Sequence, residues 1–293
     1  MRAKERRRTA PAPLPVASPA GAATARRHGP PPSEDAIDVA VVARRGDWRA
    51  LAVLVDSLRE HATRPLRLHV LARPGAEAME ERLVTCFGDL AFDWAPTDGL
   101  PGRSLRALLG DLLPAVERAL VLPLPAVATG DVAELAALDL GGHAFAAPLR
   151  PGTRGASGFG VLHGAAARLR DRTDAAAELR RAAHARHAFD FDAFSADVLV
   201  ADLTQWREQR VGAHALGLHA AYGLADVEAL HLLAGPHRAT VPAQWAIVPT
   251  RTPERAAGLV YWADPVKPWH ERRTPERALW RRHAEALRLR PAR

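Results

Sequence analysis

The chain has 293 residues, of which 48% are hydrophobic, 25% charged and 5% aromatic, and this composition is typical of a globular protein and excludes disorder throughout. Its length fits one large domain or two small ones. The formal net charge of +7 is concentrated at the ends, because residues 1–35 hold seven Lys or Arg against three acidic residues, and residues 271–293 hold eight Arg against three. The middle is nearly neutral, so we expect no specific binding of nucleic acid.

The first 36 residues are rich in Pro, Ala and Arg and have no periodic apolar face, which predicts a disordered basic tail. The single cysteine, Cys86, cannot form an internal disulfide, and this favours a reducing compartment and a cytoplasmic location. No window approaches the roughly 18 uncharged apolar residues that a membrane span needs. We expect a folded domain over residues 37–270 and an Arg-rich helix over residues 271–293.

Apolar runs and helical periodicity alternate along the folded part. The expected elements, in chain order, are a strand at 37–43, a helix after Asp47, a strand at 66–72, a helix at 77–87, a strand at 91–95, a helix at 104–117, a strand at 119–124, a helix at 131–138, a strand at 143–148, a loop at 150–164, a helix at 175–187, a strand at 198–203, a helix with Trp206 and a last helix at 274–289. This order predicts an α/β fold with a mainly parallel sheet flanked by helices.

Five segments along the chain carry a recognisable pattern, namely RALVLPLPAVATGDVAELAALDLGG (118–142), FSADVLVADLTQWRE (194–208), DVEALH (226–231), PAQW (242–245) and VYWADPVKPWH (260–270). In this order they resemble sequences of glycosyltransferase family 8. The resemblance implies a GT-A fold, a mixed and mainly parallel sheet that binds a nucleotide-sugar. It also implies retaining transfer of a hexosyl group from a UDP-linked donor to an acceptor hydroxyl, with Mn or Mg held by an Asp-x-Asp pair and a distant histidine.

The metal positions of that family are replaced in this chain. Pro123 and Pro125 stand where the paired aspartates are, and Tyr261 stands where the histidine is. Proline has no side-chain ligand atom, so we expect no bound metal and no cofactor here. Other positions of the family's site also differ, while the apolar positions around them are kept; the replacements are Ser195, Asp197, Val227, His231 and Ala246.

Some residues still match the family's site. Asp226 matches the first acid of the D-Q-D segment, and we take it as the candidate catalytic residue, although it could equally be the N-cap of a helix at 227–233. Arg106 and Lys267 match basic residues that in the family lie near the donor. Arg44 and Arg45 follow the first strand, where the family usually has an acidic residue. These four basic side chains are the candidate donor-binding residues.

Two functions remain open. The first is a glycosyltransferase in which arginine and lysine neutralise the diphosphate of a nucleotide-sugar without a cation. The second is a catalytically inactive relative that binds a glycan or a protein partner. Convergence of Arg44, Arg106 and Lys267 on one cleft would favour the first. The chain lacks the glycine motif of a dinucleotide-binding fold, a P-loop and a G-x-S-x-G elbow, so these classes are excluded.

Overall fold

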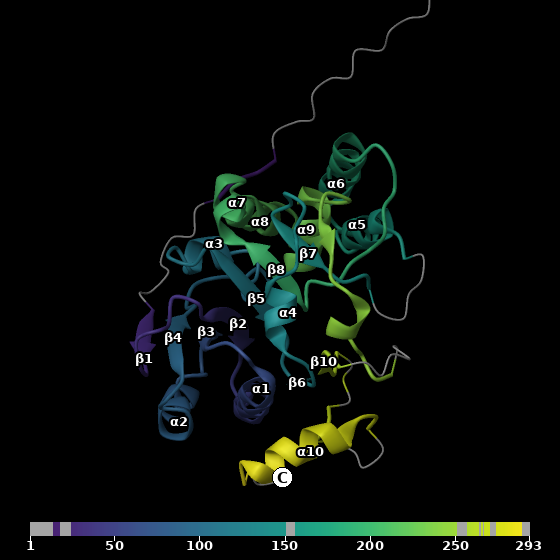
Figure 1. The fold of residues 1–293 in the computed structure, drawn as a ribbon. Helices are drawn as coiled ribbons and strands as arrows, with labels where there is room; N and C mark the ends of the chain where they lie inside the picture. Colours follow the sequence, from purple (N-terminus) through teal and green to yellow (C-terminus); the bar gives the residue numbers. More distant parts are fainter. Residues whose placement is uncertain are drawn as a thin grey trace, which may run out of the picture.

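The computed structural model describes residues 14–17, 25–150, 156–250, 257–263, 265, 267–269 and 274–288. An eight-stranded sheet with the order β1-β4-β3-β2-β5-β8-β7-β9 lies at its centre, and a two-stranded sheet pairs β10 with β6 (Figure 1). The strands are β1 (Arg26–His28), β2 (Ile37–Ala43), β3 (Leu66–Ala72), β4 (Ala91–Pro96), β5 (Arg118–Leu122), β6 (Ala126–Ala128), β7 (Phe145–Ala147), β8 (Leu199–Asp202), β9 (Ala239–Thr240) and β10 (Leu259–Tyr261).

Strands β4, β3, β2 and β5 run parallel, whereas β1 and β8 join this block in antiparallel fashion. Helices cover both faces of the sheet, with α1 and α2 on one side and α3 and α7 on the other (Figure 1). The helices are α1 (Trp48–His61), α2 (Ala78–Cys86), α3 (Leu109–Leu112), α4 (Val132–Ala136), α5 (Gly158–Ala167), α6 (Thr173–Arg186), α7 (Leu203–Glu208), α8 (Val211–Tyr222), α9 (Asp226–Leu233), α10 (Arg277–Ala286) and the 3-10 turn η1 (Ala243–Trp245).

The central strands form where the sequence is apolar on both faces, as expected for a covered parallel sheet. In β2, Val39 and Val41 face the α1 and α2 side, while Ala40 faces the α3 side, and all three are buried. The strands expected at 37–43 and 66–72 match the structure to the residue. Both end at the same edge of the sheet, so the residues that follow them lie close together.

Two expected elements were wrong. The helix expected over 104–117 is confined to α3, with turns on either side of it. The loop expected over 150–164 contains the start of α5, because the side chain of Ser157 accepts a hydrogen bond from the Gly160 backbone N–H and caps this helix. Residues 151–155 lie outside the described part of the chain.

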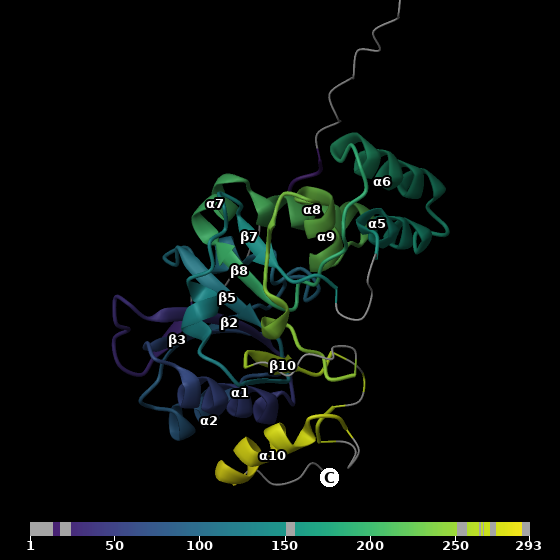
Figure 2. The ribbon, with the colours of Figure 1, turned by 45° about the vertical axis from the view of Figure 1, so that its right-hand side comes forward.

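Part of the expected disordered tail is ordered. Strand β1 pairs with β4, and the Ala17 backbone N–H donates to the carbonyl of Ala213 on α8 at 2.9 Å. Residues 1–13 and 18–24 lie outside the described part, so the rest of that expectation stays a prediction. Helix α10 lies beside α1 (Figure 2), where Trp280 is buried and His283 Nδ1 is 2.8 Å from Asp56. In the described residues no helix combines the length and apolar character that crossing a membrane requires.

Candidate functional site

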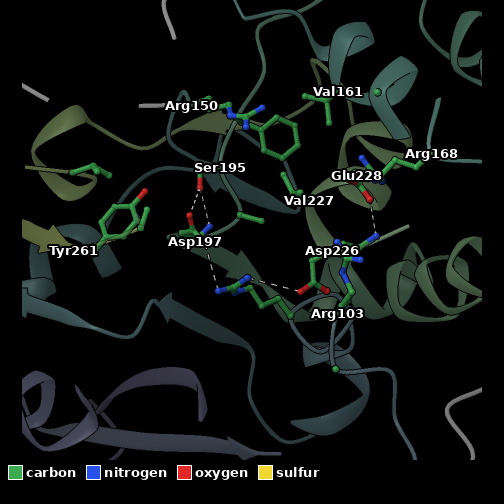
Figure 3. Close-up of a pocket in the computed structure, with 18 of the residues that line it drawn as sticks. Arg103, Arg150, Val161, Arg168, Ser195, Asp197, Asp226, Val227, Glu228 and Tyr261 are labelled. Carbon is green, nitrogen blue, oxygen red and sulfur yellow. Dashed lines mark hydrogen bonds and ion pairs between the residues drawn. The ribbon is translucent and has the colours of Figure 1, made fainter. Parts of the chain in front are cut away.

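A cavity of about 540 Å³ opens where β2 and β3 end. Figure 3 shows side chains that line it. Arg44 directly follows β2 and Arg73 directly follows β3, and both line this cavity. We call it the arginine cavity, because its lining includes six arginines and three acidic residues, namely Arg44, Arg73, Arg103, Arg106, Arg150, Arg168, Asp197, Asp226 and Glu228. The excess of positive charge makes it suited to an anionic ligand.

The structure brings together three of the five residues chosen from the sequence. Arg44, Arg106 and Asp226 line the cavity, whereas Arg45 and Lys267 do not. The aliphatic part of the Arg45 side chain lies beside Gly75, and Lys267 Nζ donates to the carbonyl of Trp262 at 2.7 Å. Arg44 and Arg106 thus line the same cavity, and Lys267, which is not in its described lining, acts on the carboxyl of Asp47 together with Arg44 and Arg73.

Sequence reasoning missed four of the six arginines. Arg73 could have been found by the same rule that selected Arg44, because each residue directly follows a buried parallel strand. Arg103 and Arg168 lie in turns and Arg150 lies in irregular chain, with no regular pattern around them, so only the tertiary structure shows that they line the cavity.

Asp226 is a buried residue at the first position of α9. It is not the N-cap, which is Ala225, so the alternative interpretation of this aspartate was wrong. Its carboxylate accepts a hydrogen bond from the Ala107 backbone N–H at 3.1 Å and lies 3.9 Å from Arg106 Nη1. Burial raises the pKa of Asp226 to about 6, although Arg106 and the backbone donors act in the opposite direction. Asp226 therefore ties α9 to the segment that carries Arg106.

Asp197 lies on the other side of the same guanidinium group. Arg106 Nη2 is 3.5 Å from Asp197 Oδ1, and the Ser195 hydroxyl donates to Asp197 Oδ2 at 2.9 Å. The Asp197 backbone N–H donates in turn to Ser195 Oγ at 3.1 Å. Figure 3 shows the side chains of Ser195 and Asp197 next to each other at the cavity wall. Arg106 is thus held between two carboxylates that come from distant segments.

The described contacts of His231 are internal to the fold. Its Nδ1 donates to the carbonyl of Val227 at 2.5 Å, and its Nε2 accepts from the Phe194 backbone N–H at 3.2 Å. Its ring stacks on that of Phe194 with 3.9 Å between centroids. Burial lowers the pKa of His231 to about 4, so the ring is neutral near pH 7. It therefore holds the segment at Phe194 that directly precedes Ser195.

The residues at the family's metal positions do not fit a hard divalent cation. Pro123 and Pro125 are buried and offer no ligand atom, and the Pro125 carbonyl already accepts a hydrogen bond from the Trp262 backbone N–H at 3.2 Å. Tyr261 is buried in β10 and offers only a phenol. Within the described residues there is no group of three or more His, Cys, Asp or Glu side chains that could hold a metal ion.

No protein-family model matches the sequence, and no curated protein matches it. Solved structures do match. The galactosyltransferase LgtC, solved in complex with donor and acceptor sugar analogs, is 16% identical over 87% of this chain and 98% of its own, with a TM-score of 0.66. The bifunctional glycosyltransferase WbbM is 14% identical over 90% of this chain and 51% of its own, with a TM-score of 0.62.

The glycosyltransferase GlyE of Streptococcus pneumoniae is 15% identical over 85% of this chain and 60% of its own, with a TM-score of 0.56. These likenesses, together with the mainly parallel sheet and its flanking helices, show that the chain has the GT-A glycosyltransferase fold. The fold class expected from the sequence is confirmed.

Proposed function

We propose that this chain binds a nucleoside diphosphate sugar, UDP-linked, in the arginine cavity and transfers the sugar to a hydroxyl acceptor without a divalent cation. The observation that supports this most directly is the convergence of six arginines on one cavity at the end of the parallel strands. In open α/β sheets, ligands bind beyond the carboxyl ends of the strands. A volume of about 540 Å³ is within the usual range for small-molecule sites.

The diphosphate is the part of such a ligand that the arginines suit. When the bond between sugar and diphosphate breaks, negative charge develops on the leaving phosphate, and fixed positive groups stabilise it. Guanidinium groups bind phosphate oxygens in a bidentate manner. The ion pairs described in the cavity involve Arg106 and Arg168, whereas Arg44 and Arg73 lie near the carboxyl of Asp47, and although burial raises the pKa of this carboxyl, both arginines act to lower it. We infer that Arg44, Arg73 and Arg103 hold the diphosphate in place of the metal.

A second candidate is binding of the same ligand without turnover. Val227 lines the cavity where the resembled family has glutamine, and Asp226 is buried against Arg106 and Ala107. An apolar side chain can neither donate to nor accept from a sugar hydroxyl. This arrangement favours a binding module with a glycosyltransferase scaffold.

Calorimetric titration with UDP tests the proposal before any acceptor is known. We expect metal-free protein in EDTA to bind UDP, with the affinity unchanged by added Mn²⁺. Arg73→Ala is expected to weaken binding about tenfold, because a charge-assisted hydrogen bond contributes about 1.5–3 kcal/mol. Arg180→Ala, which removes an exposed arginine from α6, is the matched control.

The outcomes of this titration separate the candidates. Absence of UDP binding, or binding only with Mn²⁺, would contradict the proposed metal-free site. Where UDP binds, release of UDP from UDP-glucose or UDP-galactose, followed by chromatography, distinguishes transfer to water or an acceptor from binding alone.

Replacing Gly102 with alanine gives a separate test of the same arginines. A Cβ at this position would lie 2.6 Å from Cζ of Arg73, and the guanidinium group is the flexible end of a long side chain. We therefore expect Arg73 to be displaced, UDP affinity to fall several-fold and the melting temperature to change little. Unchanged affinity in Gly102→Ala together with unchanged affinity in Arg73→Ala would remove Arg73 from the site.

A further inference from the structure

We propose that Asp197, with Ser195, binds hydroxyl groups of the sugar in the nucleoside diphosphate sugar, and that Asp197 gives the cavity its preference for the sugar-bearing ligand over the nucleotide alone. This assignment rests on the proposed function, since it places the sugar end of the same ligand. The resembled family has glycine at this position, so the carboxylate is a feature of this chain.

Of the three acidic side chains that line the arginine cavity, Asp197 is the most exposed. The Glu228 carboxylate accepts from the Ala225 backbone N–H at 2.8 Å and is bound by Arg168, and only 10% of its side chain is exposed. The Asp226 side chain is 9% exposed and faces Arg106 and Ala107. The Asp197 side chain is 38% exposed. Of these three, Asp197 is therefore the carboxylate that a ligand can reach.

Asp197 has free capacity to accept hydrogen bonds. An ionised carboxylate offers about four acceptor positions. In this structure Oδ2 accepts from the Ser195 hydroxyl at 2.9 Å, and Oδ1 lies 3.5 Å from Arg106 Nη2. About two acceptor positions are left for a ligand at the cavity wall, where Figure 3 shows Asp197. The Ser195 hydroxyl can rotate and donate to the same ligand.

The charge of Asp197 decides which part of the ligand it meets. A carboxylate repels phosphate oxygens, whereas a sugar hydroxyl donates a hydrogen bond to it. Arg44, Arg73 and Arg103 attract phosphate and offer no acceptor for a hydroxyl proton. A ligand with an anion at one end and several hydroxyls at the other satisfies both groups. These charges suit a ligand whose diphosphate meets the three arginines and whose sugar meets Asp197 and Ser195.

Metal-free calorimetric titrations test this assignment. They compare the affinities of Asp197→Asn and of the unaltered protein for UDP, UDP-glucose and UDP-galactose. We expect the unaltered protein to bind at least one of the two sugar nucleotides about 10- to 100-fold tighter than UDP. We expect Asp197→Asn to lose most of this advantage and to keep its affinity for UDP. Asp171→Asn, at an exposed turn outside the cavity, is the matched charge control.

Each outcome has one meaning. If the unaltered protein does not bind UDP, the proposed function fails and this assignment fails with it. If UDP binds but neither sugar adds affinity, or if Asp197→Asn keeps the advantage, the assignment of Asp197 is overturned and the nucleotide site stands. Ser195→Ala, expected to reduce the advantage several-fold, replaces Asp197→Asn if circular dichroism shows that the latter does not fold.

Discussion

Trp206→Ala is expected to lower the free energy of unfolding by about 3–5 kcal/mol, the usual cost of deleting a buried tryptophan side chain. Trp206 is 1% exposed, and its ring contacts Phe145 edge-on with 5.5 Å between centroids. Its indole N–H donates to the carbonyl of Ala107 at 2.8 Å. The substitution therefore leaves a cavity and also an unpaired carbonyl.

The same substitution is expected to weaken UDP binding. The Ala107 backbone N–H donates to Asp226, so one residue connects the buried indole to the buried carboxylate beside Arg106. Loss of the indole frees the segment that carries Arg106. We expect UDP affinity to fall several-fold in the protein that remains folded, as the arginine is less well positioned.

Urea denaturation and calorimetry at 10 °C measure the two effects. Trp206→Phe is the control, because it keeps most of the aromatic packing and loses the hydrogen bond, which contributes about 0.5–1.5 kcal/mol. A loss of less than about 1 kcal/mol in Trp206→Ala would contradict the packing described for this helix.

Asp93→Asn is expected to cost about 3–5 kcal/mol at pH 5.5, because it leaves the buried His69 and the mostly buried Arg67 without their counter-charge. Asp93 lies in β4, with Arg67 Nη2 at 2.5 Å, His69 Nδ1 at 3.2 Å and Arg27 Nε at 3.1 Å. The His69 side chain is fully buried, and its Nε2 is 2.6 Å from Asp38. This network connects four neighbouring strands.

The pKa values of this network give its pH dependence. Burial alone lowers the pKa of His69, but Asp38 and Asp93 outweigh this and raise it above its ordinary value. Its contribution is therefore complete below about pH 6.5 and is lost as the pH rises through the raised pKa. Burial alone raises the pKa of Asp93, but His69, Arg67 and Arg27 outweigh this and bring it well below its ordinary value. Its contribution is complete above about pH 4 and is lost as the pH falls.

The stability difference between Asp93→Asn and the unaltered protein is thus expected to be largest between about pH 4 and pH 6.5. Urea denaturation at intervals from pH 3 to pH 9 measures it. Asp89→Asn, which removes an exposed carboxylate from its pair with Arg59, is the control and is expected to change stability by less than about 1 kcal/mol at every pH. A difference for Asp93→Asn that does not vary with pH would contradict the charged state of His69.

The boundaries of β2, β3 and α2 were predicted well because their signals are local. A buried parallel strand needs an apolar run, and an amphipathic helix needs apolar residues at helical spacing, so both patterns are visible in the sequence. The predicted helix at 104–117 failed because its leucines serve turns and a short α3 that pack under the sheet. Tertiary packing overrides periodicity in such segments.

That Pro123, Pro125 and Tyr261 are poor ligands for a hard cation could be predicted, because side-chain chemistry is fixed by residue type. The positions of the charged groups could not. Lys267 matched the resembled family and Arg45 follows Arg44 directly, yet neither is among the residues described as lining the cavity. Arg73 and Asp197 reach the cavity from segments more than a hundred residues apart. Residue type is local information, whereas the convergence of charge on one cavity depends on how the strands and helices pack, and only the tertiary structure decides it.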